Sequence, residues 1–101
     1  MSSGTENRPH PLTEHALRQL IHVALERGYY TECLHHPERN ISADDVIHGL
    51  ERSDWTLITA PELHGRSYRY EISTLDVEGD QLTLIVEAHP EEKRIEIITA
   101  W

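Results

Sequence analysis

Cysteine, basic residues and long apolar runs are all scarce in this 101-residue sequence. Its single cysteine, Cys33, excludes a disulfide within the chain. Neither a basic leader followed by an apolar stretch nor an apolar run of membrane-spanning length is present. These absences predict a cytoplasmic protein that is not embedded in a membrane.

Acidic residues outnumber basic residues two to one. Eighteen Asp and Glu against nine Lys and Arg give a formal net charge of -9. Such a charge repels polyphosphate backbones unless the few basic residues gather on one surface. The composition therefore disfavours general nucleic-acid binding.

Sequence motifs for cofactors and metals are also absent. The chain has no Gly-rich phosphate loop, no nucleophile elbow and no Cys-x-x-Cys or His-Glu-x-x-His spacing. The segment CLHHP does place Cys33, His35 and His36 within four residues, and Glu32 with His36 has the spacing of a helical metal pair. A polar loop is the alternative for this segment, and we expect no cofactor and no bound metal.

The sequence divides into a short polar start and one periodic region. The first eleven residues, MSSGTENRPHP, carry two prolines and show no periodicity, so they predict a disordered tail over 1–11. Residues 12–101 have helix-like spacing in their first half and strand-like alternation in their second half. They predict a single small α+β domain.

The first periodic segment predicts a one-sided helix that ends at Gly28, because its apolar residues recur at intervals of three and four. These residues are Ala16, Leu17, Leu20, Ile21, Val23 and Ala24. Thr13 is placed to cap the N-terminus of this helix. A second, short helix is predicted over 43–52, where Ser42 and two following aspartates satisfy free backbone N–H groups and complement the helix dipole.

Beyond Asp54 the apolar period shortens to two, which is the spacing of strands. Four strands are predicted, over 55–61, 67–74, 82–88 and 94–101. Their short connections, with Gly79 in one turn, favour a four-stranded antiparallel meander covered on one face by both helices. The stretch from 29 to 40 has no clear period and is interpreted as a helical extension or an ordered loop.

Apolar residues occur on both alternations of the last two predicted strands. Leu84 and Ile97 suit one face of the sheet, whereas Ile85 and Ile98 lie on the opposite alternation. We therefore expect a homodimer, or another protein partner, to cover the second face.

Polar residues form a stripe along the first predicted helix, at His15, Arg18, His22 and Glu26. At about 100° per residue this stripe points away from the apolar face, which favours a solvent-exposed surface. His15 has a second interpretation as a catalytic or ligand-binding group. The dipole at a helix N-terminus favours neutral imidazole, which can act as a base near neutral pH.

Several basic residues lie on or beside the predicted strands: Arg66, Arg69, Lys93 and Arg94. If two strands bring them together they form an anion or phosphate site, and scattered surface charge is the alternative. Tyr68 and Tyr70, two residues apart, likewise fit either core packing or base stacking.

Six short segments occur in the order found in an uncharacterised bacterial family. They are HAL (15–17), ERG (26–28), ISADDV (41–46), GRSYRYEI (65–72), LTLIV (82–86) and IEIITAW (95–101). On these segments the chain resembles the domain of unknown function numbered 4258, in which a His-Ala helix and an Arg-Gly-Ile-Ser turn precede a second helix and closing strands. Residues 29–40 stand as an insertion relative to that pattern.

The resemblance implies a RelE-like fold, because the family is similar in architecture to the RelE and BrnT toxins, small ribonucleases of toxin–antitoxin systems. It implies a metal-independent ribonuclease with RNA or an antitoxin-like protein as partner. His15, Arg66 and Thr99 match the family and would form its catalytic site. In that role His15 is the acid or base at the 2′-hydroxyl and Arg66 stabilises the phosphorane. The alternative function is a non-catalytic, acidic protein-interaction module that dimerises through its sheet.

Overall fold

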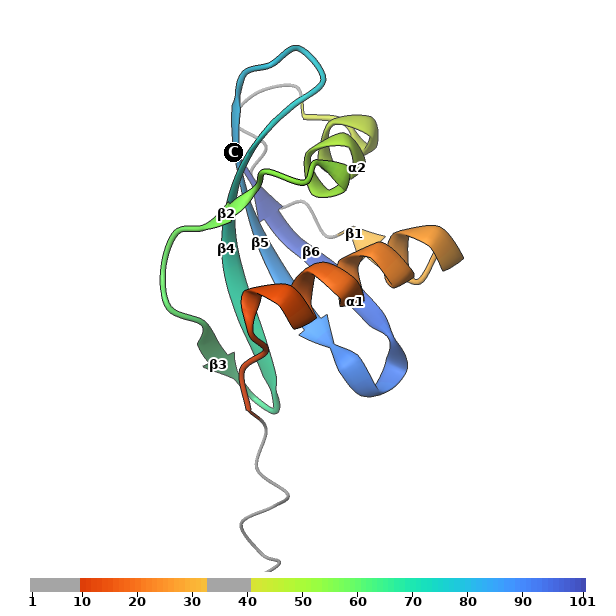
Figure 1. Ribbon diagram of the computed structural model, residues 1–101, viewed down its shortest axis with the longest axis vertical. Coiled ribbons are helices and arrows are strands. Elements are labelled where there is room, and N and C mark those ends of the chain that lie inside the picture. Colours follow the sequence, from red (N-terminus) through yellow and green to blue (C-terminus); the bar gives the residue numbers. More distant parts are fainter. Residues whose placement is uncertain (1–9, 33–40) are drawn as a thin grey trace, which may run out of the picture.

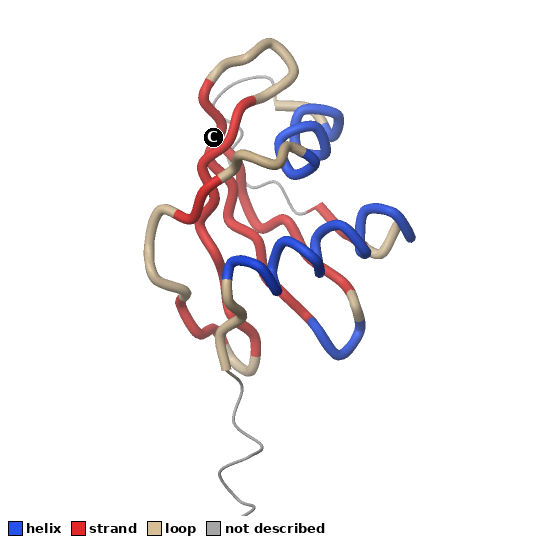
Figure 2. The backbone as a smooth tube through the Cα atoms, viewed as in Figure 1, coloured by secondary structure: helices blue, strands red, loops and turns tan. Residues whose placement is uncertain are grey.

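Two α-helices and a six-stranded sheet form the part of the chain that the computed structural model describes, residues 10–32 and 41–101. In chain order the elements are α1 (Glu14–Arg27), β1 (Tyr30–Glu32), α2 (Ala43–Glu51), β2 (Thr56–Leu57), β3 (Glu62–His64), β4 (Ser67–Leu75), β5 (Gln81–His89), the 3-10 turn η2 (Pro90–Glu92) and β6 (Arg94–Ala100). Both α-helices lie on the same side of the sheet (Figure 1), and the backbone tube shows the same arrangement (Figure 2). The predicted α+β class is confirmed. Residues 1–9 of the expected tail lie outside the described part.

The sheet is mixed. Its strand order is β1-β6-β5-β4-β2, and β3 also pairs with β4. β4, β5 and β6 form an antiparallel meander, as the sequence predicts, but β1 runs parallel to β6. The prediction of four antiparallel strands is therefore wrong, because β1 adds a parallel edge and a further short strand, β3, lies beyond the first predicted strand.

β1 comes from the stretch interpreted as a helical extension or a loop. Its first residue, Tyr30, aligns with Ile95 of β6. Three residues are too few to show a period, and their pairing partner lies near the other end of the sequence, so no local signal predicts this strand. The candidate ligands Cys33, His35 and His36 lie outside the described residues.

Of the predicted strand 55–61 only Thr56–Leu57 forms a strand, β2, and a separate strand, β3, follows at Glu62–His64. Both pair with β4. β2 pairs at Ser73 and β3 pairs at Arg69. The residues between β2 and β3 include Pro61, which has no N–H to donate to a strand partner. β3 lies beside the N-terminal end of β4.

Both helices begin at the caps expected from the sequence. Thr13 Oγ1 accepts a hydrogen bond from the Ala16 N–H at 3.1 Å, and Gly28 ends α1 in the left-handed region with a φ of 74°. Ser42 and Asp45 form a reciprocal capping box at the start of α2, which ends one residue before the predicted position. Neither of these helices has the length and apolar character needed to cross a membrane.

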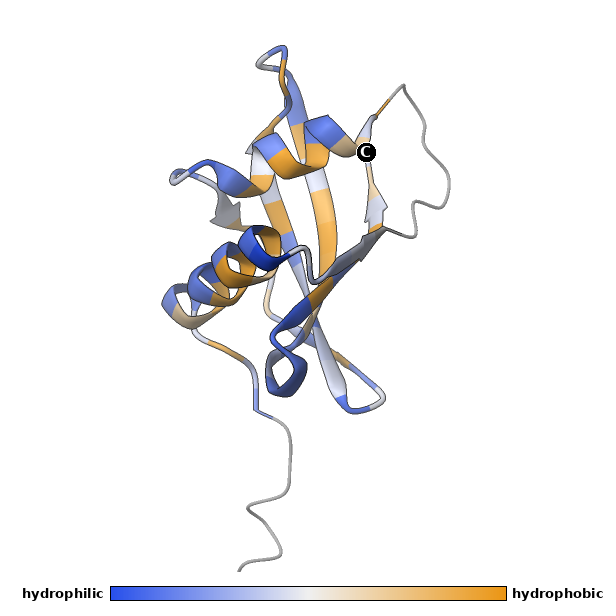
Figure 3. Cartoon of the chain, turned by 90° about the vertical axis from the view of Figure 1, so that its right-hand side faces the viewer, coloured by the Kyte–Doolittle hydropathy of each residue, from blue (hydrophilic) through white to orange (hydrophobic). Residues whose placement is uncertain are grey.

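The core lies between the helices and one face of the sheet. Figure 3 shows that each helix has hydrophobic and hydrophilic positions on different sides. The buried apolar side chains are Leu17, Leu20, Ile21, Ala24, Val46, Leu50, Trp55, Tyr70, Ile72, Leu82, Leu84, Val86, Ala88, Ile95, Ile97 and Ala100. Tyr70 Oη accepts a hydrogen bond from the Leu12 N–H at 2.7 Å, so Tyr70 belongs to the core and ties the segment before α1 to β4.

A β-bulge shifts the register between β5 and β6. Ile85 aligns with Thr99 and Val86 with Ile97, so Ile98 is an extra residue on β6. Ile85 and Ile98 both line a groove on the sheet face opposite the helices, where each is partly exposed. Apolar groups therefore do occur on both faces of the sheet, as the sequence predicts.

Candidate functional site

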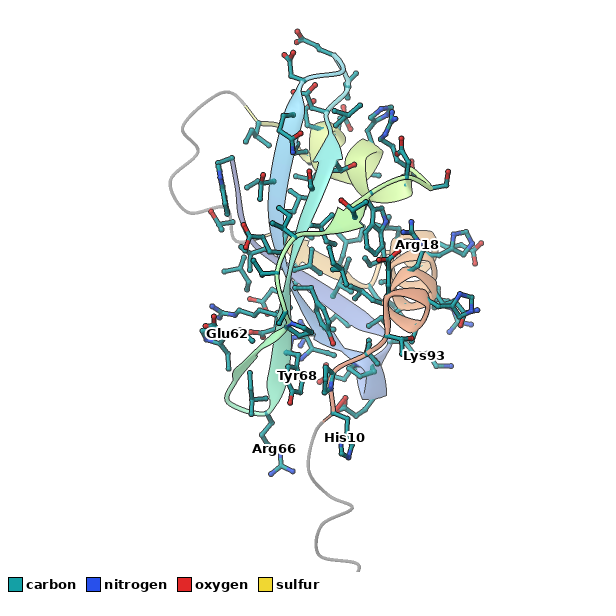
Figure 4. The ribbon with its side chains drawn as sticks, turned by 60° about the vertical axis from the view of Figure 1, so that its left-hand side comes forward. His10, Arg18, Glu62, Arg66, Tyr68 and Lys93 are labelled. Carbon is teal, nitrogen blue, oxygen red and sulfur yellow. The ribbon has the colours of Figure 1, made fainter. Side chains whose placement is uncertain are left out.

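The sheet face opposite the helices, called here the open face, carries the charged side chains of β4, β5 and β6. Alternate residues of these strands are buried under the helices, so the residues between them point the other way. The charged or titratable ones are Arg69, Glu71, Glu87, His89, Arg94 and Glu96. Glu62 of β3 projects on the same side, away from α1 (Figure 4).

A continuous set of polar contacts crosses the open face. Arg69 Nε donates a hydrogen bond to Glu87 Oε1 at 2.8 Å. Glu87 Oε2 lies 3.0 Å from His89 Nε2, and His89 Nδ1 lies 3.2 Å from Ser67 Oγ. The side chains of Glu87 and His89 are each only 14% exposed, so packing on the sheet restricts their positions.

Glu96 of β6 brings a second carboxylate to His89. Its Oε1 lies 3.7 Å from His89 Nε2 and 3.7 Å from Arg94 Nη1. Arg94 Nε also donates to Glu92 Oε1 at 3.0 Å. Glu87, His89 and Glu96 are called the His89 cluster, and each offers one ligand atom within 4.8 Å of the other two. In the described part of the chain, this is where three side chains of types able to ligate a metal converge.

A shallow groove of about 310 Å³ lies on the open face beside this cluster. Ile85 and Ile98 supply apolar surface. Polar side chains come from the connection before β3 and from β3, β4 and β6, at Thr59, Glu62, His64, Arg69, Glu71 and Thr99. His64 Nε2 lies 2.7 Å from Glu62 Oε1, so a second histidine–glutamate pair lines this groove.

A larger groove of about 780 Å³ lies on the helix side, between α1 and the end of α2. The polar stripe of α1 lines part of it, with His15, Arg18, His22 and Glu26. Arg18 is not simply solvated, because Nη1 donates to the Ser53 carbonyl and Nη2 to the Trp55 carbonyl, both at 3.0 Å. His22 is exposed and lies 3.9 Å from Glu26. The expectation of solvent exposure is thus confirmed for His15, His22 and Glu26, whereas Arg18 is partly buried.

The three residues expected to form a catalytic site lie on different parts of the molecule. His15 lines the groove on the helix side, and Thr99 lines the groove on the open face. Arg66 lies exposed in the turn between β3 and β4 and projects away from the domain (Figure 4). The structure does not bring them together, and it groups Thr99 with Arg69 and His64 instead.

The basic residues near the strands do not gather into one patch. Arg69 and Arg94 are each paired with glutamates on the open face. Lys93 occupies the turn between β5 and β6 with a φ of 52°, and Arg66 occupies a different turn. Scattered charge, not a common phosphate site, describes these four residues.

Sequence reasoning misses the His89 cluster. The spacing of Glu87 and His89 already places them on one face of a strand. Their convergence with Glu96 depends on the register between β5 and β6, which aligns Glu87 with Glu96. A signal was present in the alternation Glu-Ala-His and Arg-Ile-Glu on either side of one hairpin.

No family model matches the chain, and no curated protein or solved structure matches it either. The described residues define a small α+β protein with two helices on one face of a mixed sheet. Histidine, glutamate and arginine side chains of four strands, β3 to β6, meet on its other face. That face is the candidate functional surface.

Proposed function

We propose that this chain is a binding module whose open face docks a basic segment of a partner protein. The observation that carries the proposal is the set of carboxylates around the groove on that face. Glu62 and Glu71 line the groove, where His64 Nε2 and Thr59 Oγ1 contact one oxygen of each, and the positive charge of Arg69 is paired with Glu87. A cationic side chain placed in the groove therefore meets carboxylates from both β3 and β4.

The shape and charge of the groove favour a particular kind of partner. Its volume of about 310 Å³ is at the lower end for ligand pockets and suits individual side chains of an extended segment. Ile85 and Ile98 offer apolar contact beside the carboxylates. A second copy of the chain would bring the same acidic face against this one, and the repulsion favours a different, basic partner. The net charge of -9 attracts such a partner over longer range.

Peptide binding tests this proposal. The probes are a short fluorescent peptide of lysine, leucine and serine, and a second peptide in which glutamate replaces lysine. We expect the chain to bind the lysine peptide, with an affinity that falls as the salt concentration rises. Glu62→Gln and Glu71→Gln should each weaken binding about threefold. Glu78→Gln, in the turn between β4 and β5, is the matched control and should leave binding unchanged.

Two results would contradict the docking proposal. One is equal affinity of the wild-type chain for the lysine and glutamate peptides. The other is full affinity for the lysine peptide in the double variant Glu62→Gln, Glu71→Gln. Either result would show that the carboxylates of the groove do not recognise the basic probe.

A second candidate is the metal-independent ribonuclease with a RelE-like fold that the family resemblance implies. The observation in its favour is that the groove on the open face holds Thr99 together with Arg69 and His64. His64, 2.7 Å from Glu62, would act as acid or base, and Arg69 would stabilise the phosphorane. The carboxylates that line the groove repel RNA phosphates, which ranks this candidate second.

Incubation of RNA with the purified chain separates the two candidates. Cleavage that is lost in His64→Ala and retained in His15→Ala supports a ribonuclease centred on the groove. Cleavage lost only in His15→Ala supports the site implied by the resemblance. RNA that stays intact with a wild-type preparation that binds the lysine peptide supports docking alone.

A further inference from the structure

We propose that the His89 cluster is a binding site for one divalent transition-metal ion of the zinc class. This inference is independent of peptide docking and of ribonuclease activity. Glu87 and His89 are two residues apart on β5, and Glu96 aligns with Glu87 across β6. Their ligand atoms lie within 4.8 Å of one another. The 3.0 and 3.7 Å separations of His89 Nε2 from the two carboxylates are close to those of ligands that share one ion at about 2.0–2.2 Å.

The environment of His89 points to a cation between the three side chains. His89 Nε2 is buried and makes no hydrogen bond of acceptable geometry, although Glu87 Oε2 lies 3.0 Å away. If Nδ1–H donates to Ser67 Oγ, 3.2 Å distant, Nε2 carries a lone pair that faces two carboxylates. The lone pair and the carboxylates repel one another, and a metal ion between them would be coordinated by all three groups.

Neighbouring residues hold the ligands in the orientation that binding requires. Ser67 fixes the ring of His89 through Nδ1, which is the usual way in which a metal-binding imidazole is oriented. Arg69 engages Glu87 Oε1 and leaves Oε2 directed to His89. The side chains of Glu87 and His89 are 14% exposed and that of Glu96 is 27% exposed, so solvent can supply the remaining ligand.

The chemistry of the ligands selects the metal. One imidazole nitrogen and two carboxylate oxygens match the mixed ligand sets that bind Zn²⁺ with three protein side chains and a water. Ca²⁺ requires six to eight oxygen ligands or so, and Mg²⁺ prefers oxygen and keeps most of its waters. The positive charge of Arg94, 3.7 Å from Glu96 Oε1, competes with the metal for that carboxylate.

Zinc titration calorimetry tests the proposal. The protein is the full chain carrying Cys33→Ser, His35→Gln and His36→Gln, because CLHHP is the other soft-donor segment of the sequence. We expect one equivalent of Zn²⁺ to bind, and Glu96→Gln and His89→Asn each to weaken binding at least about tenfold. His64→Ala, which removes the other histidine on this face, is the matched control and should leave zinc affinity unchanged.

Two further variants separate a metal site from a structural ion pair. Ser67→Ala should weaken zinc binding about tenfold although it removes no ligand. Arg94→Gln should strengthen zinc binding about threefold, because a competing cation is lost. Circular dichroism of each metal-free variant shows whether it is folded. If His89→Asn is unfolded, the zinc affinity of Glu96→Gln still tests the proposal. The proposal would be overturned if the chain carrying Cys33→Ser, His35→Gln and His36→Gln bound no zinc, or bound zinc with the same affinity after Glu96→Gln was added.

Discussion

The guanidinium of Arg18 lies over the indole ring of Trp55, with 3.9 Å between Cζ and the ring centroid. Trp55 is 1% exposed and follows α2 in the chain, so the contact joins the middle of α1 to the connection between α2 and β2. Hydrogen bonds to the carbonyl oxygens of Ser53 and Trp55 fix the plane of the guanidinium. Arg18 therefore helps to hold α1 against the rest of the core.

We expect Arg18→Ala to lower the free energy of unfolding by about 2 kcal/mol, because it removes charge-assisted hydrogen bonds and a cation–π contact together. Arg18→Lys should recover only part of this loss, since an ammonium cannot donate to both carbonyls and stack on the ring. Urea denaturation measures both changes. His22→Ala, on the exposed side of α1, is the control and should change stability by less than about 0.5 kcal/mol. Equal effects of Arg18→Ala and His22→Ala would mean that the contact with Trp55 adds no stability.

Gly49 lies where α2 packs against β4. A Cβ at this position would lie 2.7 Å from Thr74 Cγ2 and 3.2 Å from the carbonyl oxygen of Leu75. Thr74 Oγ1 donates to the Gly49 carbonyl at 2.8 Å, so the threonine cannot rotate away without breaking a buried hydrogen bond. We expect Gly49→Ala to destabilise the fold by about 1–3 kcal/mol despite the better helix propensity of alanine.

Thermal unfolding followed by circular dichroism checks this prediction. Glu51→Ala, at an exposed position of the same helix, is the control and should change stability by less than about 0.5 kcal/mol. If Gly49→Ala is as stable as the original chain, α2 is free to move away from β4 at no cost.

Local signals predict much of the fold. Thr13 and Gly28 mark the ends of α1, because capping chemistry depends on a few neighbouring residues. The alternation of β4 and β5 predicts the buried face of the sheet for the same reason. β1 could not be predicted because its stability comes from parallel pairing with β6. The separate strands β2 and β3 could not be predicted because each is defined by its pairing with a different part of β4.

The candidate site depends more on register than on pattern. Glu87 meets Glu96 because β5 and β6 pair in one particular register, and the bulge at Ile98 then brings Thr99 into line with Ile85. A shift of one residue would place any of these side chains on the other face. The position of His15 in α1 is predicted correctly from local spacing. Its separation from Arg66 and Thr99 is set by how the elements pack in three dimensions, which local spacing does not show.

The buried phenol of Tyr70 predicts a loss of stability at high pH. Burial raises the pKa of Tyr70, although the hydrogen bond from the Leu12 N–H opposes the shift. The folded chain therefore disfavours the phenolate more than the unfolded chain does. The protonated phenol therefore makes its full contribution to the stability of the fold below the ordinary tyrosine pKa of about 10. This contribution is lost as the pH rises from there towards the higher pKa of Tyr70 in the folded chain.

Denaturation curves measured from about pH 10 upwards should show that the free energy of unfolding falls with pH in the original chain and falls less steeply in Tyr70→Phe. The variant should also be less stable by about 1 kcal/mol near neutral pH, because the Leu12 N–H loses its acceptor. Identical slopes above pH 10 or so in the two proteins would assign the alkaline instability to other groups.

Asp45 connects the start of α2 to the turn between β4 and β5. Its Oδ2 accepts hydrogen bonds from the N–H and the hydroxyl of Ser42, both at 3.0 Å, and its Oδ1 accepts from the Val77 N–H at 3.2 Å. We expect Asp45→Ala to lower the free energy of unfolding by about 1–2 kcal/mol, since capping and the turn contact are lost together. Asp44→Ala, at the neighbouring first-turn carboxylate, should cost less than about 0.5 kcal/mol. Urea denaturation compares the two variants, and equal losses would mean that charge near the helix N-terminus, not the geometry of the Asp45 contacts, sets the stability of α2.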